Sequence, residues 1–185
     1  MPATQSRCLF FALGAALVTS TASAKSEHFA IDPVHTRIAF KVDHLGLSKS
    51  IGTFSGANGT LDFDRDDWHS AKVAVDIPLD RLDMGDPKWK DKVLSASLLG
   101  VKQQPVARFV STSVEPGTGD RALIHGTLSL RGHDSPITLD AHLNALKRDS
   151  VTFKRTIGFS AITTPSRMAL TVDGYLEAIG DAICV

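Results

Sequence analysis

The sequence predicts an all-β fold of roughly eight antiparallel strands in a single domain. Three features indicate this class. Short runs alternate between apolar and polar residues, the same runs are rich in β-branched residues, and turn-forming residues separate one run from the next. Strands with one apolar face must bury that face, either between two packed sheets or inside a closed barrel. The periodicity by itself leaves both architectures open.

The N-terminal segment 1–24 predicts an export signal rather than part of the fold. Arg7 precedes an apolar run over 8–18, and Ala22-Ser23-Ala24 matches the small-residue pattern at which signal peptides are cleaved. The apolar run is shorter than the roughly 20 residues that span a bilayer, and an uncleaved anchor is the alternative. We therefore expect cleavage after Ala24, a single domain over 25–185, and no stable membrane insertion of that domain.

The first predicted strand covers 36–44 and alternates strictly. Ile38, Phe40 and Val42 share one face, and His44 lies at the end of that face. A histidine in that place is either a hydrogen-bonded structural residue beside a turn or a group at the mouth of a cavity. Further along, Asn58-Gly59 stands between two alternating runs and predicts a two-residue hairpin.

Six further runs predict the remaining strands, and most of them have one apolar face. The runs are 70–79, 106–115, 122–132, 136–144, 151–161 and 178–185. Their apolar faces include Val73, Val75, Leu128, Leu130, Ile137, Leu139, Phe153, Ile157 and Phe159. Strict alternation also places Arg155 on the face of Phe153 and Ile157. Either it pairs with a pyrophosphate-like or carbonyl end of a ligand, or a β-bulge turns it outward.

Two longer connections interrupt the strands. In the connection 80–105, Asp86 followed by Pro87 is typical of a helix start, with a capping carboxylate and a proline in the first turn. We expect a short helix there. The connection 164–181 is expected to be a loop with a single helical turn.

Composition argues against several classes of function. The 20 basic residues balance the 20 acidic ones, and no basic stripe or polybasic cluster stands out, so neither nucleic-acid binding nor firm electrostatic membrane docking is expected.

Cys184 is the one cysteine in 25–185, which rules out a disulfide within that domain; we expect it to be a buried strand residue. The seven histidines show no metal-ligand spacing, and no nucleophile motif or phosphate loop is present. We expect no metal, no cofactor and no catalysis.

A binder of apolar molecules needs no such marked residues. Each buried methylene contributes about 0.8 kcal/mol, so affinity comes from area rather than from special groups. A pocket of this kind is made of Ile, Leu, Val and Phe with a few polar groups at one end. In a sequence it looks the same as a packed core.

Several separated motifs of the sequence match those of one known family. The segment 32–56, DPVHTRIAFKVDHLGLSKSIGTFSG, has Asp-Pro-x-His, an alternating strand that leads to His-x-Gly-x-Ser, and Gly-x-Phe. The segment 125–143 contains a Gly-x-Leu-x-x-Arg-Gly-x-x-x-Pro stretch, and the segments 76–94 and 104–115 continue the match. In these motifs the sequence resembles the YceI-like proteins, and the resemblance covers nearly all of the chain after the predicted signal.

This resemblance implies a lipocalin-like, eight-stranded antiparallel β-barrel that is exported to the periplasm and associates as a homodimer. It implies a bound polyisoprenoid, isoprenoid quinone or similar lipid as the partner, and no catalytic reaction. In such a barrel we expect His44 near a mouth, where it could meet the polar end of the lipid. The residues expected to line the cavity are Ile38, Phe40, Val42, His44, Phe54, Val73, Val75, Leu128, Leu130, Ile137, Leu139, Phe153, Arg155, Ile157 and Phe159.

The chain departs from the family pattern in three places. The segment 90–94, KDKVL, lacks the usual histidine, and the segment 168–172, MALTV, replaces an aromatic-Gly-Met turn. The sequence ends at Val185, before the expected end of the last strand, and a short closing strand would leave an unpaired edge. Two other functions therefore remain as alternatives. One is a stress-protective or interaction protein with a vestigial cavity, and the other is an enzyme that acts on a lipid.

Overall fold

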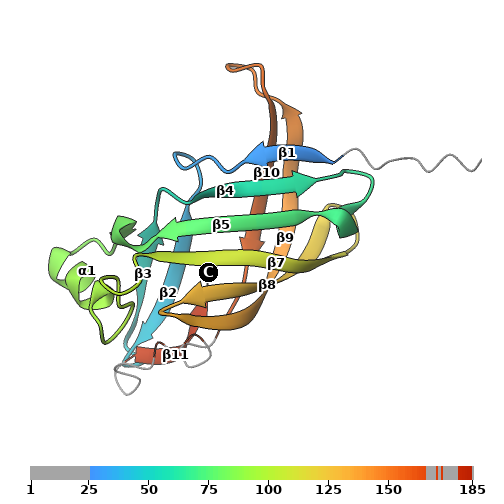
Figure 1. The fold of residues 1–185 in the computed structure, drawn as a ribbon. Helices are drawn as coiled ribbons and strands as arrows, with labels where there is room; N and C mark the ends of the chain where they lie inside the picture. Colours follow the sequence, from blue (N-terminus) through green and yellow to red (C-terminus); the bar gives the residue numbers. More distant parts are fainter. Residues whose placement is uncertain (1–25, 166–169, 171, 173–178, 185) are drawn as a thin grey trace, which may run out of the picture.

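The computed structural model describes residues 26–165, Leu170, Val172 and the backbone of 179–184. These residues form two antiparallel sheets that curve around a common interior as a nearly closed barrel (Figure 1). The larger sheet has seven strands in the order β1-β4-β5-β7-β8-β9-β10, and the smaller has four in the order β11-β2-β3-β6. The prediction of an antiparallel, barrel-like all-β fold is confirmed. The strand count differs, because the described residues form 11 strands.

The larger sheet contains the long strands that form most of the wall. Its strands are β1 (Glu27–Ala30), β4 (Asn58–Phe63), β5 (Lys72–Pro78), β7 (Val106–Pro116), β8 (Arg121–Leu130), β9 (His133–Arg148) and β10 (Arg155–Ile162). The smaller sheet contains β2 (Ile38–His44), β3 (Ser48–Phe54), β6 (Leu82–Asp83) and β11 (Ile179–Cys184). Strand β1 was not predicted, so the alternating run that starts the sequence pattern is the second strand of the fold. Among the described residues, none of the helices could span a bilayer.

The predicted helix in the connection 80–105 is present as α1 (Pro87–Leu94) and lies at one end of the barrel beside β3 (Figure 1). Asp86 Oδ1 accepts a hydrogen bond of 2.9 Å from the backbone N–H of Trp89, and Pro87 occupies the first turn. The capping prediction is therefore confirmed, and one otherwise unpaired amide is satisfied. Arg131 Nη2 donates to the carbonyl oxygen of Ala96 at 3.2 Å and so ties the segment after the helix to the β8–β9 turn.

The predicted hairpin at Asn58-Gly59 is wrong. Both residues lie in β4, and the chain passes from the smaller sheet to the larger one through 55–57. A Cβ at Gly59 would overlap the carbonyl oxygen of Ala74 on β5, so the glycine permits a close approach of two strands. A two-residue turn lies instead at Arg131-Gly132, where φ is 55° and 77°, as a type I′ hairpin requires.

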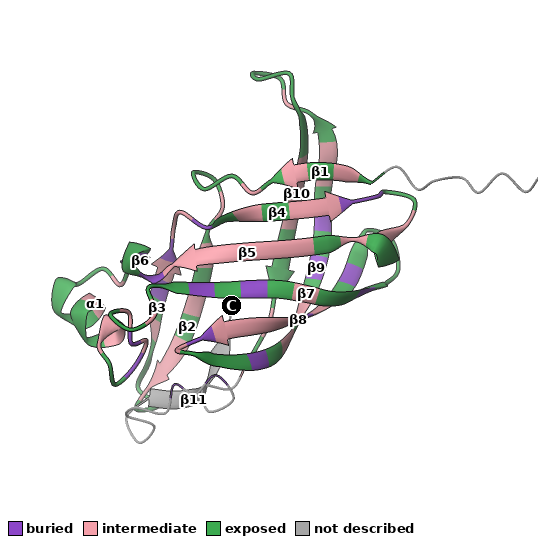
Figure 2. Cartoon of the chain, in the orientation of Figure 1, coloured by how far each residue is buried: buried purple, intermediate pink, exposed green. Residues whose placement is uncertain are grey.

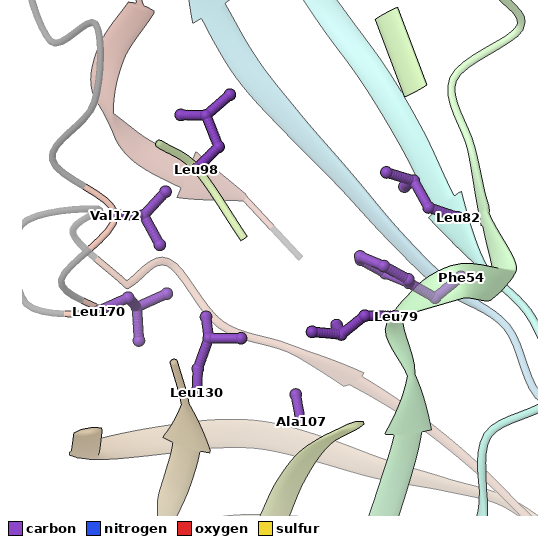
Figure 3. Packing of buried hydrophobic residues seen from close by; sticks show 8 residues of the cluster. All are labelled: Phe54, Leu79, Leu82, Leu98, Ala107, Leu130, Leu170 and Val172. Carbon is purple, nitrogen blue, oxygen red and sulfur yellow. The ribbon is translucent and has the colours of Figure 1, made fainter. Parts of the chain in front are cut away.

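A cluster of buried hydrophobic residues, here called the packed end, lies at the α1 end of the barrel, where Val93 and Leu94 of α1 pack against it. Figure 3 shows its buried side chains. Its buried members are Phe54, Leu79, Leu82, Leu98, Ala107, Leu130, Leu170 and Val172. Leu79 and Leu82 are each 2% exposed, and full burial of such a side chain contributes roughly 1.5–3 kcal/mol. Figure 2 shows the contrast with β5, which is half-buried along most of its length.

The C-terminal part is described only in places. Most of the predicted loop 164–181 lies outside the described residues, although Leu170 and Val172 within it are buried. Strand β11 agrees with the run predicted from 178 onward, and it pairs antiparallel with β2 in an irregular register. The predicted burial of the Cys184 side chain lies outside what the structure describes.

Candidate functional site: the interior of the barrel

The central strands of the larger sheet carry an apolar row on one face. Val75 of β5 pairs with Phe109 of β7, and Phe109 pairs in turn with Leu128 of β8. Residues directly opposite each other in an antiparallel sheet project to the same face, so the three side chains form a row across three strands. Ile124 of β8 and Leu139 of β9 form a further pair of this kind.

Several of these side chains are only half-buried, although alternation directs them inward. Val73, Val75, Ile124 and Leu139 all fall in this class. On the outer face of the same sheet, Val110 of β7 and Leu123 of β8 are exposed. A close-packed core leaves few gaps between its side chains, so the half-buried inner residues indicate an interior that packing does not fill. An apolar, partly open interior of a small barrel suits one small or slender ligand.

Six of the residues predicted to line the cavity belong to the packed end or pack against it. They are Ile38, Phe40, Phe54, Leu128, Leu130 and Ile137. The rings of Phe40 and Phe54 stack with their centroids 5.6 Å apart. Leu128 is half-buried and also belongs to the apolar row, so it lies where the packed end meets the more open part. These residues close the interior on the α1 side.

Aromatic side chains pack at another place on the barrel wall. Phe159 of β10 lies edge-on to Phe63 of β4, with ring centroids 5.6 Å apart. Trp68 belongs to the short helix η1 (Trp68–Ser70), and its ring centroid is 5.1 Å from that of Phe63 and 6.3 Å from that of Phe159. Edge-to-face contacts of this kind are favourable. The sequence predicted Phe159 but not its two partners. The alternation of Phe63 with Leu61 could have predicted that Phe63 faces the interior. Trp68 follows an acidic stretch without periodicity, so the sequence carried no such signal for it.

Arg155 has a protein partner that neither sequence alternative included. Its Nε donates to Glu27 Oε2 of β1 at 2.6 Å. The bulge that would turn Arg155 outward is not found. A bulge lies instead in β9, where Asn144 is the extra residue, because the pairing shifts from Ala145 to Leu143 while β10 continues without interruption. Arg155 therefore stays on the side of Ile157 and is neutralised by a carboxylate of the chain itself.

His44 lies at the α1 end of β2, next to Val42, and is half-buried. Its ring is 5.4 Å from that of Trp89 at an interplanar angle of 67°. Its Nδ1 atom is buried and has no hydrogen-bond partner among the described residues. Buried polar atoms are normally satisfied, so this nitrogen could bind a polar ligand group. His44 and Val42 stay predicted ligand contacts.

Phe153 was predicted to line the cavity, and this prediction is wrong. Strand β10 begins at Arg155, and Phe153 lies in the preceding turn with φ of 56° and 72% exposure. The turn forms because the Asp149 carboxylate accepts hydrogen bonds from the backbone N–H groups of Val151 and Thr152, at 2.8 and 2.6 Å. Asp is favoured in turns for this reason. The Asp149 turn therefore contains Val151 and Phe153, where the apolar pattern had predicted a strand.

A pocket of about 310 Å³ lies between the first half of β9 and the end of β10. It is lined by Pro136, Ile137, Thr138, Thr163, Thr164, Pro165 and Leu170. The volume is at the lower limit of small-molecule sites, which run from roughly 300 to 1,000 Å³. Its hydroxyl groups would suit a polar end better than a long chain.

Charged side chains near the predicted ligand contacts pair on the outer surface. Lys49 Nζ donates to Asp43 Oδ1 at 2.8 Å, and this bond, followed by that from the backbone N–H of Gly46, lowers the pKa of Asp43 below its ordinary value of 3.8. Arg108 and Asp76 form a similar pair at 3.1 Å. Within the described ranges, no group of three or more His, Cys, Asp or Glu side chains could hold a metal ion.

Comparisons with known sequences identify one family, and comparisons with solved structures show a shared fold. The YceI-like domain model matches residues 29–185. A UPF0312 protein of Pseudomonas putida is 35% identical over 156 residues, which is 83% of this chain and 80% of the relative. Among solved structures, Burkholderia cenocepacia BcnA has a TM-score of 0.71 at 19% identity, covering 80% of this chain and 91% of that one. A polyisoprenoid binding domain from Saccharophagus degradans, implicated in plant cell wall breakdown, has a TM-score of 0.55 at 10% identity, with coverage of 86% and 94%. The chain belongs to the YceI-like domain family.

Proposed function

We propose that the chain is a periplasmic binding or carrier protein that holds a long apolar amphiphile inside the barrel. The ligand class is a polyisoprenoid, an isoprenoid quinone or a similar lipid, and no catalytic step is part of the proposal. The observation that carries it is the half-buried state of Val75 and Leu128, which flank the buried Phe109 in the apolar row. The shared fold of the Saccharophagus degradans polyisoprenoid binding domain supports the ligand class, and the export signal predicted over 1–24 supports the location.

The energetics of such binding need no special residue. Ten buried methylenes contribute about 8 kcal/mol before association costs, and those costs amount to several kcal/mol. A long chain with more methylenes therefore reaches useful affinity by area alone. His44 lies beside Trp89 at the packed end, and its Nδ1 has no hydrogen-bond partner among the described residues. It would meet the polar end of the lipid only if that end reached past the packed residues.

The first test is to identify what the protein carries. The full chain is expressed with its own N-terminal segment, purified from a periplasmic extract and extracted with organic solvent for mass spectrometry. A stoichiometric isoprenoid or quinone supports the proposal. A chain that is recovered empty and does not take up an added polyprenol contradicts it and favours an interaction protein with a vestigial cavity.

A matched pair of substitutions tests whether the lipid lies against the apolar row. Val75→Thr puts a hydroxyl on the inner face, whereas Val110→Thr makes the same change on the outer face of the adjacent strand, where the side chain is 40% exposed. An unpaired buried hydroxyl costs about 1–3 kcal/mol, so we expect V75T to weaken polyprenol binding about fivefold or more. The V110T variant is expected to bind like the unchanged protein. Equal binding by all three proteins would contradict this location.

A further inference from the structure

We propose that the β9–β10 hairpin docks the protein on the surface of an anionic phospholipid bilayer. Val151 and Phe153 at the tip would enter the headgroup region, while basic side chains behind them contact lipid phosphates. The contact is peripheral, with no segment that spans the bilayer. It goes beyond the lipid-binding function proposed above and does not depend on which molecule the barrel holds.

The hairpin stands out from the sheet as a ribbon of two strands (Figure 1). The pairing of β9 with β8 ends at His142, and beyond this point β9 pairs only with β10, up to Arg148 opposite Arg155. A two-stranded ribbon in water is marginally stable by itself. Its outermost pair still touches the barrel, because Arg155 contacts Glu27 of β1, and the turn 149–154 beyond that pair extends away from the sheet.

The tip of the ribbon presents apolar side chains to the solvent. Val151 is 81% exposed and Phe153 is 72% exposed. Phe153 has φ of 56°, a conformation that glycine and asparagine adopt at lower cost than an aromatic residue. A turn that only reverses the chain would favour Gly or Asn at this position. Exposed Phe and aliphatic side chains next to basic ones are typical of segments that lie in the membrane interface.

Four backbone N–H groups of the tip are already bonded within the turn. The Asp149 carboxylate accepts from the N–H groups of Val151 and Thr152. The N–H of Phe153 donates to the Asp149 carbonyl at 3.0 Å, and the N–H of Asp149 donates to the Lys154 carbonyl at 2.8 Å. Unpaired amide groups are costly in a medium of low polarity. The turn can therefore enter the headgroup region without exposing them.

The charges of the ribbon complement an anionic surface. Residues 147–155 contain four basic side chains and one acidic one. Arg148 and Arg155 lie directly opposite each other, an arrangement of like charges that destabilises a sheet. Glu27 neutralises Arg155, whereas Arg148 donates to the neutral carbonyl of Phe153 at 3.1 Å. A lipid phosphate would supply the second anion. The balanced charge of the whole chain conceals this local excess.

A second apolar turn joins β2 to β3, where Leu47 is 82% exposed. Its charge environment differs, because Lys49 at the start of β3 pairs with Asp43 at the end of β2, at 2.8 Å. The local positive charge is thereby cancelled. Charge complementarity favours the β9–β10 hairpin, and Leu47 provides a control at a separate turn.

The test measures flotation of the full chain with vesicles of phosphatidylcholine that contain about one third phosphatidylglycerol, against phosphatidylcholine alone. We expect binding only to the anionic vesicles, and loss of it when salt rises from about 50 mM to about 500 mM. The double variant Val151→Ser with Phe153→Asn should bind the anionic vesicles at least about tenfold more weakly than the unchanged protein. Asparagine is chosen at 153 because it tolerates the positive φ there. Phe153→Trp should preserve binding, and Lys147→Gln with Lys154→Gln should weaken it about tenfold.

Leu47→Ser is the matched control and should bind vesicles like the unchanged protein. Thermal melting and polyprenol uptake from detergent are measured on the same samples. Loss of vesicle binding with normal uptake then supports the docking proposal, whether or not the natural ligand is a polyprenol. Absence of vesicle binding, equal binding by the tip variants, or loss of binding on Leu47→Ser would overturn it. Self-association that the tip variants abolish would also overturn it, because the tip would then contact a second copy of the chain.

Discussion

Arg155 of β10 and Glu27 of β1 form an ion pair of 2.6 Å between the two outermost strands of the seven-stranded sheet. No backbone ladder joins these two strands within the described residues. The pair therefore bridges a gap that hydrogen-bonded strand pairing leaves open. The Arg155 and Glu27 side chains are 50% and 35% exposed, respectively, and solvent screening limits what such a pair contributes to stability.

A double-mutant cycle with Glu27→Gln and Arg155→Met should give a coupling energy below about 1 kcal/mol, because exposed ion pairs are weak. The coupling should fall further at high salt. Urea unfolding of the four proteins measures it. A coupling of several kcal/mol that does not change with salt would show that the pair is effectively buried.

Substitution of Gly52 by alanine should destabilise the smaller sheet. A Cβ at this position would come within 2.6 Å of Met84 Sδ and still nearer to the Phe40 ring. Because strain of this kind costs about 1–3 kcal/mol, we expect a lower urea midpoint for Gly52→Ala. The nearest atoms are all side-chain atoms, so adding Phe40→Leu should recover part of the loss. A double variant less stable than the sum of the two single changes would contradict this contact.

Truncation of Leu79 tests the packed end of the barrel. Leu79 is 2% exposed, and Leu→Ala changes in cores cost about 2–5 kcal/mol through lost contacts and a cavity. The same change at Leu47, which is 82% exposed, should stay within about 0.5 kcal/mol. Chemical denaturation of both variants checks the difference. Similar losses at both positions would mean that the packed end is not the stable core.

The order of the β9–β10 turn should depend on the ionisation of Asp149. Hydrogen bonds from the N–H groups of Thr152 and then Val151, followed by the Thr152 hydroxyl, lower the pKa of Asp149 below its ordinary value of 3.8. Because the folded pKa is the lower one, the stabilisation is fully present above the ordinary value and is lost as the pH falls through the folded value. An NMR titration should place the Asp149 midpoint below 3.8. In Asp149→Ala, amide exchange at Val151 and Thr152 should be faster at neutral pH. A midpoint at or above the ordinary value would contradict these bonds.

Local chemistry made some parts of the fold predictable from the sequence. Asp86 with Pro87 marks the start of α1 because both residues act within one turn of helix. The alternation of Ile38, Phe40 and Val42 marks β2 because side chains alternate across any strand. Asn58-Gly59 misled the prediction because the need for glycine came from the approach of Ala74, a contact 15 residues away in the chain. Phe153 misled it because the Asp149 turn outweighed the apolar pattern.

The sequence by itself determined an antiparallel all-β domain, the helix at Asp86-Pro87 and the apolar character of the inner face, since each depends on periodicity or on neighbours along the chain. Only the tertiary structure decided which inner residues pack as core and which stay half-buried. Leu130 and Leu139 have the same chemistry and the same alternation, yet only Leu130 is in the packed cluster. Leu130 is buried because residues far from it in the chain, such as Leu98 and Leu170, pack in the same cluster (Figure 3). The order of residues along a strand cannot show which of them such segments will cover.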